Sequence, residues 1–346
     1  MNKILLLFVF IFSFSSYSQT INGSVFDEKK EPIPGVSVYL DGTTIGTITD
    51  ENGKYSLDTN QNSNVSLIVQ ALGYETIIID KSLKNNNLEL YLIPKQTQLK
   101  EVIVKKEFFT RKQKLAVFKE QFLGQSKAGK SCLIDNEEEI ILDYDYTTNV
   151  LSATSINPIK VKNPYLGYDV EFNLQEFYVK FYKRSVKSID AIESSFLGTT
   201  LYREVKKDSK VEKIRKEVYQ NSAMNFFKIL ANNKWKEAKY IFYTGSFPAN
   251  PEHFFTITQE GDFKKITVLY NDVKKHLLSN KTKFYAEYSL LNKKNQSKIM
   301  FYTNEFYVDK FGNNSNSREI RFSGYLGTQR LGDLLPSNYL PLLNAN

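Results

Sequence analysis

The chain has 346 residues and a formal net charge of +8, from 46 Lys and Arg against 38 Asp and Glu. The basic residues are spread along the chain and interleaved with acidic ones. This pattern favours a solvated surface, with some attraction to anionic glycans or lipid headgroups, over nucleic-acid binding. Cys132 is the sole cysteine, so an intramolecular disulfide is excluded.

Residues 1–19 have the layout of a secretory signal peptide. Lys3 supplies a positive charge, residues 4–14 form an apolar core, and small or polar residues follow at 15–19. The segment is too short for a membrane span, although an uncleaved anchor helix is the alternative. No cysteine lies near the expected cleavage site, which argues against a lipoprotein. We therefore expect an exported protein that is periplasmic, associated with the outer membrane or secreted, with a mature charge of +7.

Residues 20–94 predict an antiparallel β-sandwich of about seven strands. Short β-branched and aromatic runs recur at a spacing of roughly 8–12 residues, with Gly, Pro, Asn and Asp between them. The turn Asp50-Glu-Asn-Gly53 is typical of a hairpin. It is not a calcium loop, because the downstream bidentate Glu is missing.

Three motifs in this region carry a family resemblance. They are Pro32-x-Pro-Gly-Val-x-Val38, Gly42-Thr-Thr-x-Gly-Thr-x-Thr-Asp-x-Asn-Gly-x-Tyr55 and Leu72-Gly-Tyr-Glu-Thr76. Together they resemble the carboxypeptidase-like regulatory domain, a transthyretin-like sandwich common in envelope proteins of Bacteroidetes. The resemblance implies a fold and a cellular setting, and it implies no activity.

Residues 95–106 connect the sandwich to the rest of the chain. Their Leu99-x-Glu-Val-x-Val104 run is similar to a strand that leads from this sandwich to the plug domain of outer-membrane transporters. No plug-like sequence follows, and residues 107–346 are too few for the large barrel of such a transporter. The chain is thus expected to contain a signal peptide (1–19), a sandwich (20–94), a linker or strand (95–106) and a C-terminal domain (107–346).

Residues 107–346 predict a larger α+β domain dominated by strands. We expect an amphipathic helix over 109–123 and two packed helices over 209–233 with a break at Asn221-Ser222. Expected strands cover 139–146, 149–154, 159–162, 169–184, 254–259, 265–270, 282–291, 298–303 and 319–324, and the apolar tail 331–343 is expected as coil or one helical turn. The segments 118–124, 165–168 and 215–227 look similar to a C-terminal module that accompanies the sandwich in other Bacteroidetes proteins, a resemblance that implies no activity.

Acidic residues near the start of this domain raise the question of a metal site or an acid pair. Asp143 and Asp145 follow the Glu run at 137–139. Alternation places both Asp residues with Ile141 on one strand face, and no Asp-x-Asp-x-Asp-Gly loop is present. A solvated strand edge is therefore the favoured interpretation.

Cys132, His253 and His276 form no recognisable catalytic set. A zinc carboxypeptidase needs a His-x-x-Glu pair and a distant His, and neither His begins such a pair. Cys132 lies beside an apolar pair, as expected of a small buried hydrophobe rather than a nucleophile. A Gly-x-Ser-x-Gly elbow and a phosphate loop are also missing. We predict no catalytic, cofactor-binding or metal-binding residue, and no residue is assigned to binding.

Three functional interpretations remain open. The leading one is a secreted or envelope-associated, non-enzymatic binding or adaptor protein, whose partner is an unknown envelope protein or glycan. The second is a carboxylate-dependent hydrolase acting on envelope or dietary glycans, because a catalytic carboxylate pair meets only in space. The third is a component associated with an outer-membrane barrel, which the two helical regions disfavour.

Overall fold

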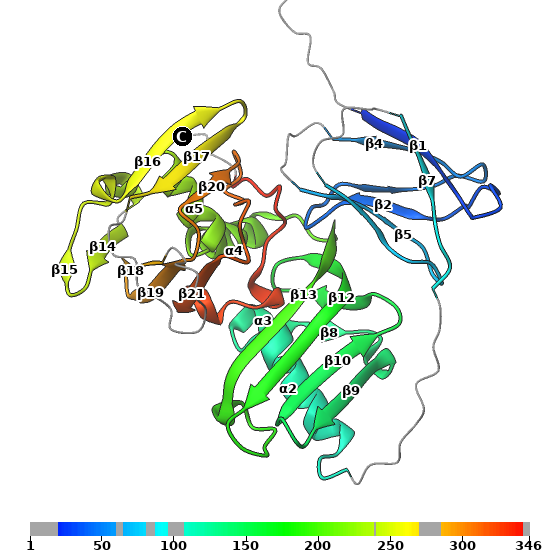
Figure 1. The fold of residues 1–346 in the computed structure, drawn as a ribbon, viewed down its shortest axis with the longest axis horizontal. Helices are drawn as coiled ribbons and strands as arrows, with labels where there is room; N and C mark the ends of the chain where they lie inside the picture. The colour runs from blue at the N-terminus through cyan, green and yellow to red at the C-terminus, as the bar shows by residue number, and fades with distance from the viewer. Residues whose placement is uncertain are drawn as a thin grey trace, which may run out of the picture. The chain divides into compact units, whose positions relative to one another are not determined.

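The computed structural model describes residues 20–59, 65–80, 87–95, 107–238, 240–269 and 285–341 (Figure 1). The expected signal peptide, most of the 95–106 segment and His276 lie outside these residues. The chain divides into two compact units. Among the described residues, one contains 20–39, 45–59, 67–80 and 87–95, and the other contains 40–44, 65–66, 107–238, 240–269 and 285–341.

The N-terminal region is a two-sheet sandwich of seven strands, as predicted. One sheet has the order β4-β1-β7 and the other β3-β2-β5-β6 (Figure 1). The strands are β1 (Thr20–Phe26), β2 (Ser37–Leu40), β3 (Gly46–Ile48), β4 (Lys54–Asp58), β5 (Leu67–Gln70), β6 (Ile77–Ile79) and β7 (Asn87–Tyr91). The arrangement is not wholly antiparallel, because β1 pairs with β7 in parallel, with Asn22 opposite Asn87.

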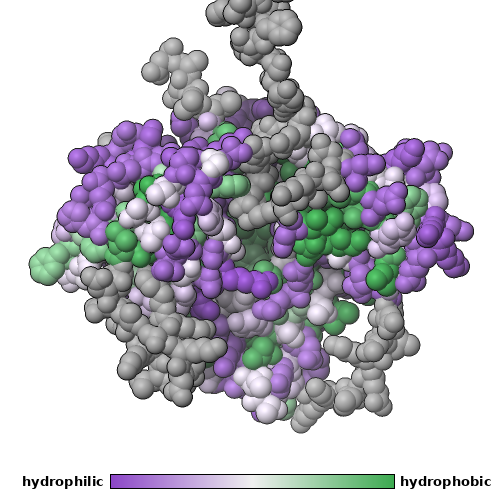
Figure 2. All heavy atoms as spheres, turned by 45° about the horizontal axis from the view of Figure 1, so that its top comes forward, coloured by the Kyte–Doolittle hydropathy of each residue, from purple (hydrophilic) through white to green (hydrophobic). Residues whose placement is uncertain are grey.

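Alternating side chains of these strands form the core of the sandwich. In β1, Ile21 and Val25 are buried, and in β4, Tyr55 and Leu57 are buried while their neighbours are exposed. This period of two is what the sequence predicts for strands with one face on a core. Apolar side chains also gather on the surface of this unit (Figure 2), where the exposed apolar residues include Ile48, Leu72, Ile78, Tyr91 and Ile93.

Gly53 shows why the predicted hairpin turn needs glycine. Its φ of 70° lies in the left-handed region, and its carbonyl accepts a hydrogen bond of 2.8 Å from the Val25 N–H. A Cβ at this position would lie 2.5 Å from the Val25 carbonyl oxygen. Gly35 has a similar φ of 72°, but a Cβ there would have no neighbour within 4 Å.

We predict that Gly53→Ala destabilises the sandwich more than Gly35→Ala. Both variants strain the backbone by about 1–2 kcal/mol, and only the first also forces a contact with the carbonyl of Val25. Denaturant unfolding followed by far-ultraviolet circular dichroism measures both. Equal losses would show that the close approach of β1 to this turn contributes nothing.

The first part of the larger unit is a six-stranded sheet with helices on one face. Its order is β8-β11-β12-β10-β9, and β13 pairs with β12 (Figure 1). The strands are β8 (Leu133–Ile134), β9 (Ile140–Asp145), β10 (Val150–Ser155), β11 (Ile159–Asn163), β12 (Tyr168–Phe181) and β13 (Ala191–Glu204). They are accompanied by the helices α2 (Arg111–Leu123) and α3 (Lys127–Ser131) and by the 3-10 helices η1 (Glu137–Glu139) and η2 (Ser188–Asp190).

Helix α2 ends at the predicted residue, Leu123, but begins at Arg111, two residues after the predicted start at 109. Thr110 and Gln113 form a capping box at its start, and Gly124 follows its last residue with a φ of 98°. Phe118 and Phe122 are fully buried, and their rings pack on aromatic rings of the sheet, including Phe177. Such capping and an aromatic stripe together attach the helix to the sheet.

The second part of this unit has a core rich in aromatic residues. A five-stranded sheet, β15-β14-β18-β19-β21, and a three-stranded sheet, β16-β17-β20, pack with α5 around it (Figure 1). The strands are β14 (Tyr240–Thr244), β15 (Phe247–Pro248), β16 (Phe255–Glu260), β17 (Phe263–Val268), β18 (Ala286–Asn292), β19 (Asn295–Phe301), β20 (Glu305–Val308) and β21 (Ile320–Gly324). The remaining helices of the larger unit are α4 (Ser209–Gln220), α5 (Ala223–Ala231), α6 (Trp235–Ala238), η3 (Pro251–His253), η4 (Leu326–Thr328) and η5 (Leu331–Asp333). Of these, α4 and η5 pack on the core of the first part, through residues such as Tyr219 and Leu331.

The helical region at 209–233 breaks at the predicted place, but α4 buries a different line of residues. Ser222 caps α5, as expected from Asn221-Ser222. The innermost residues of α4 are Val211, Arg215 and Tyr219. Ile214 and Val218, which helical spacing places on one face with Val211, are only partly buried. Arg215 is unusual because a charged side chain is seldom buried, and this one is only 1% exposed.

Arg215 is buried because every one of its five N–H groups has an acceptor. Nε donates to the Leu166 carbonyl at 2.8 Å, and Nη2 donates to the carbonyls of Gly167 and Lys206. Nη1 donates to carboxylate oxygens of Glu204 and Glu212. The guanidinium also lies 4.0 Å from the centre of the Tyr168 ring. Full pairing is what makes a buried guanidinium tolerable.

We predict that Arg215→Met lowers the free energy of unfolding of the larger unit by about 3 kcal/mol, because it removes the hydrogen bonds that a buried guanidinium donates to three carbonyls and two carboxylates. Lys298→Met, which removes an exposed ion pair with Glu287 of 2.9 Å, is the control and should cost less than 1 kcal/mol. Fluorescence of Trp235, the sole tryptophan, reports unfolding of this unit. A similar small loss in both variants would contradict the role given to Arg215.

Candidate functional site

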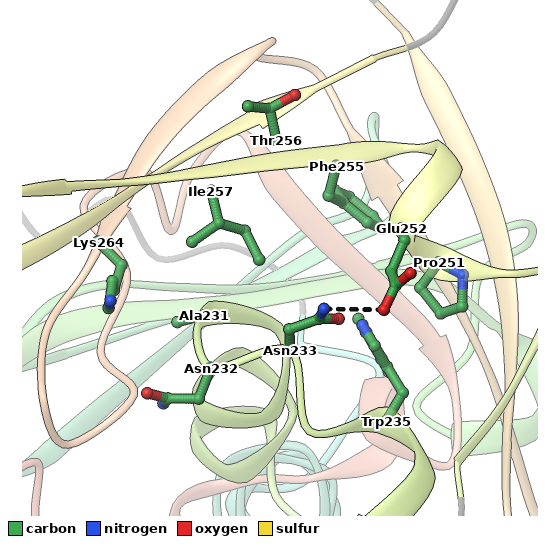
Figure 3. A pocket seen from close by; sticks show the side chains of 10 residues that line it. All are labelled: Ala231, Asn232, Asn233, Trp235, Pro251, Glu252, Phe255, Thr256, Ile257 and Lys264. Atoms are coloured by element: carbon green, nitrogen blue, oxygen red, sulfur yellow. Dashed lines mark hydrogen bonds between the residues drawn. The ribbon is translucent and has the colours of Figure 1, made fainter.

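An open pocket of about 590 Å³ lies in the aromatic part of the larger unit (Figure 3). It is bounded by the C-terminal end of α5, by α6, by η3 and by the strands β16 and β17. Its polar side chains are Asn232, Asn233, Glu252, Thr256 and Lys264, and its apolar wall is formed by Ala231, Trp235, Pro251, Phe255 and Ile257. Thr256 points away from α5, whereas the other four polar residues border the hollow (Figure 3).

Asn233 reaches the pocket through the way α5 ends. The Asn233 N–H donates to the Leu230 carbonyl at 3.1 Å, and the Lys234 N–H donates to the Ile229 carbonyl at 3.0 Å. This is a Schellman ending, which requires a left-handed residue directly after the helix cap. Asn233 takes that position with a φ of 52°. Asparagine tolerates it better than other non-glycine residues, so the turn holds an amide at the pocket wall.

Glu252 faces Asn233 from η3. Pro251 occupies the first turn of this short helix, and the Asn250 side chain accepts from the Glu252 N–H. Asn233 Nδ2 donates to Glu252 Oε1 at 2.8 Å (Figure 3). The hydrogen bond from Asn233, followed by one from Asn250, holds the pKa of the Glu252 carboxyl below its ordinary value. The group is therefore a carboxylate at neutral pH and accepts hydrogen bonds from a ligand.

The apolar wall is rigid because it belongs to the core. The rings of Trp235 and Phe255 are stacked with centroids 6.5 Å apart, and Phe226 and Phe242 pack against Trp235. Both Trp235 and Phe255 are almost fully buried, so the polar residues around them lie on a fixed base. A preformed pocket with a few polar groups over an apolar wall is the usual form of a small-ligand site.

The chemistry of this pocket suits binding better than hydrolysis. Glu252 is the one carboxylate among its lining residues, and glycoside hydrolysis by paired carboxylates needs two. Glu204 and Glu212 do approach each other elsewhere in the unit, but both bind Arg215 Nη1. Across the described residues, no group of three His, Cys, Asp or Glu side chains has the arrangement of a metal site.

The acidic residues considered from sequence lie away from this pocket. Asp143 and Asp145 are on the exposed face of β9 with Ile141, as predicted. The Asp145 carboxylate accepts from Thr147 and Thr148, which lowers its pKa. It thus caps a turn.

His253, considered from sequence and assigned to no site, follows Glu252 in η3. Sequence reasoning missed Asn233, Glu252 and Lys264. Two sequence features could have pointed to Asn233 and Glu252. They are the Asn232-Asn233 pair directly after a helix and the Asn250-Pro-Glu252 start of η3.

Cys132 is buried, as predicted, with 8% of its surface exposed. Its Sγ donates to the Ala128 carbonyl at 3.3 Å. Burial, together with the nearby Asp333 carboxylate, raises the pKa of the Cys132 thiol to about 12. Because a thiolate is the reactive form, this thiol is inert at neutral pH.

We predict that a thiol reagent labels Cys132 in the native protein at pH 8 far more slowly than in denaturant, by a factor of about 100 or more. Mass spectrometry of the labelled protein over time gives both rates. Rapid labelling of the native protein would contradict the buried, protonated state and would reopen a nucleophilic role for Cys132.

Comparison with known proteins places the sandwich in a family. Residues 21–104 match the CarboxypepD_reg-like domain family. The chain is 36% identical over 78 residues to the TonB-dependent receptor P39 of Formosa agariphila, and 35% identical over 79 residues to the TonB-dependent receptor SusC of Bacteroides thetaiotaomicron. These matches cover 20% and 22% of this chain but only 7% and 8% of the receptors, so the similarity concerns one domain.

Two solved structures are also similar to part of the chain. Both are crystal structures of a mutant type II cohesin–X-dockerin complex from Acetivibrio cellulolyticus. The first is an N-terminal interface mutant and the second is a C-terminal interface mutant. The first is 20% identical with a TM-score of 0.20 and covers 22% of this chain and 58% of the matched one. The second is 22% identical with a TM-score of 0.18 and covers 21% and 51%. In the part of the chain that the structure describes, no helix has the length and apolarity to cross a bilayer.

Proposed function

We propose that the protein is an exported, envelope-associated binding protein without catalytic activity, in which the larger unit binds a glycan and the sandwich attaches it to an envelope partner. The envelope setting is supported by the sandwich family and by the similarity of this region to two TonB-dependent receptors. Exposed apolar residues on the sandwich, among them Leu72 and Ile93, fit a protein-docking role.

The observation that carries the glycan-binding role is the hydrogen bond between Asn233 and Glu252 at the wall of an open, preformed pocket. It fixes an amide and a carboxylate side by side, and both retain acceptor capacity for hydroxyl groups. Neighbouring hydroxyls are the polar groups that a sugar presents most densely. The single carboxylate of the pocket favours binding over the hydrolase alternative.

Titration of the exported chain with a panel of envelope and plant-type oligosaccharides tests this role, with the fluorescence of Trp235 in the pocket wall as the signal. We expect Asn233→Gly and Glu252→Gln each to weaken binding roughly tenfold, the loss expected for one or two hydrogen bonds. Asn233→Gly suits this test because glycine keeps the left-handed turn, so stability should be preserved.

Glu287→Gln, an exposed change outside the pocket, is the matched control and should bind like the wild-type protein. Failure of the wild-type protein to bind any oligosaccharide would overturn the proposed function. Unchanged binding by both pocket variants would show that the ligand lies elsewhere.

A further inference from the structure

The pocket carries opposite charges at its two ends, and among the described residues only Glu252 has hydrogen-bond partners for its charged group. Glu252 stands with Asn233 on the side of η3, while Lys264 stands on β17 on the other side, beyond Ile257 (Figure 3). Asn232 lies at the lower edge of the pocket on the Lys264 side (Figure 3). A ligand that fills the pocket therefore meets a carboxylate at one end and an ammonium group at the other.

The carboxylate end is already compensated by the protein. Asn233 and Asn250 both donate to Glu252, and the positive charge of Lys236 acts in the same direction on its pKa. Glu252 therefore needs no cation from a ligand. Its remaining lone pairs are suited to neutral donors such as hydroxyl groups.

Lys264 is in the opposite situation. Within the described part of the chain its ammonium has no ion pair and no hydrogen bond. The next residue, Lys265, is by contrast paired with Glu305 at 3.1 Å and lies 4.0 Å from Glu260. Two adjacent lysines of β17 thus differ: Lys265 is neutralised by neighbouring strands, and Lys264 has no counter-charge among the residues that the structure describes.

The ammonium group of Lys264 determines which ligands bind tightly in the pocket. Lys264 is already half-buried, and a ligand that covers it must replace the water around the ammonium group. A neutral ligand only partly replaces that hydration, whereas an anionic group forms a charge-assisted hydrogen bond. The carboxylate of Glu252 acts against a second anion at the far end, because like charges placed together are costly.

We propose that the pocket binds an acidic saccharide through one carboxylate, which lies at Lys264, with the hydroxyl groups of the sugar at Asn233 and Glu252. This proposal rests on the glycan-binding function above and adds the charge class and the orientation of the ligand. The repulsion from Glu252 makes the site selective for a saccharide with a single acidic group in the pocket over a densely charged polyanion.

Calorimetric titration of the exported chain with a uronic-acid oligosaccharide, and with the same oligosaccharide after reduction of its carboxyl groups, tests the proposal. We expect the acidic form to bind about tenfold or more tightly than the reduced form. Lys264→Met, which keeps the length of the side chain and removes its charge, should abolish this preference and leave affinity for the reduced form within about twofold. Lys265→Met, on the same strand but outside the pocket lining, should retain the preference.

The possible failures are distinct. If neither form binds the wild-type protein, this inference and the proposed glycan-binding function both fall. If both forms bind equally and Lys264→Met changes neither affinity, the pocket still binds glycans but the assignment of the carboxylate to Lys264 is wrong. If Lys264→Met does not fold, Lys264→Gln provides the same comparison. Retention of the preference in a folded Lys264 variant would also overturn the proposal.

Discussion

The larger unit depends on the buried guanidinium of Arg215. It joins the turn between β11 and β12, the end of β13, the connection after β13, and α4, since each of these supplies at least one of its acceptors. Without this guanidinium, three backbone carbonyls and two carboxylates would each lose a hydrogen bond at a buried point of the unit. The free-energy cost of losing these hydrogen bonds fixes the position of α4 in the unit. Hydrophobic contacts are not directional, so they alone would not fix that position.

The geometry of the pocket follows from that constraint. Helix α4 ends at Asn221, Ser222 starts α5, and α5 ends in the left-handed turn that presents Asn233. Because Phe226 and Phe227 anchor α5 in the aromatic core, this end of the helix is held against β16 and η3. The polar groups of the pocket are therefore positioned by packing, with little ordering left for a ligand to impose.

Local chemistry made parts of this structure predictable from sequence. The spacing of apolar residues predicts α2 and its end at Leu123, and alternation gives the correct faces of β9. The strand β13 was missed because Ser194, Ser195 and Gly198 interrupt its apolar pattern, and its pairing with β12 is not local. The burial of Arg215 could not be predicted, since its acceptors come from four separate segments. Asn233 and Glu252 meet across 19 residues, so no spacing rule connects them.

Hydrogen exchange of the exported chain, measured with and without a saturating acidic oligosaccharide, tests most directly that the larger unit is the ligand-binding part of the molecule. The account predicts slower exchange confined to peptides covering residues 231–235, 251–257 and 263–265, with the sandwich strands unchanged. Protection confined to the sandwich, or to the exposed face of β9, would contradict it.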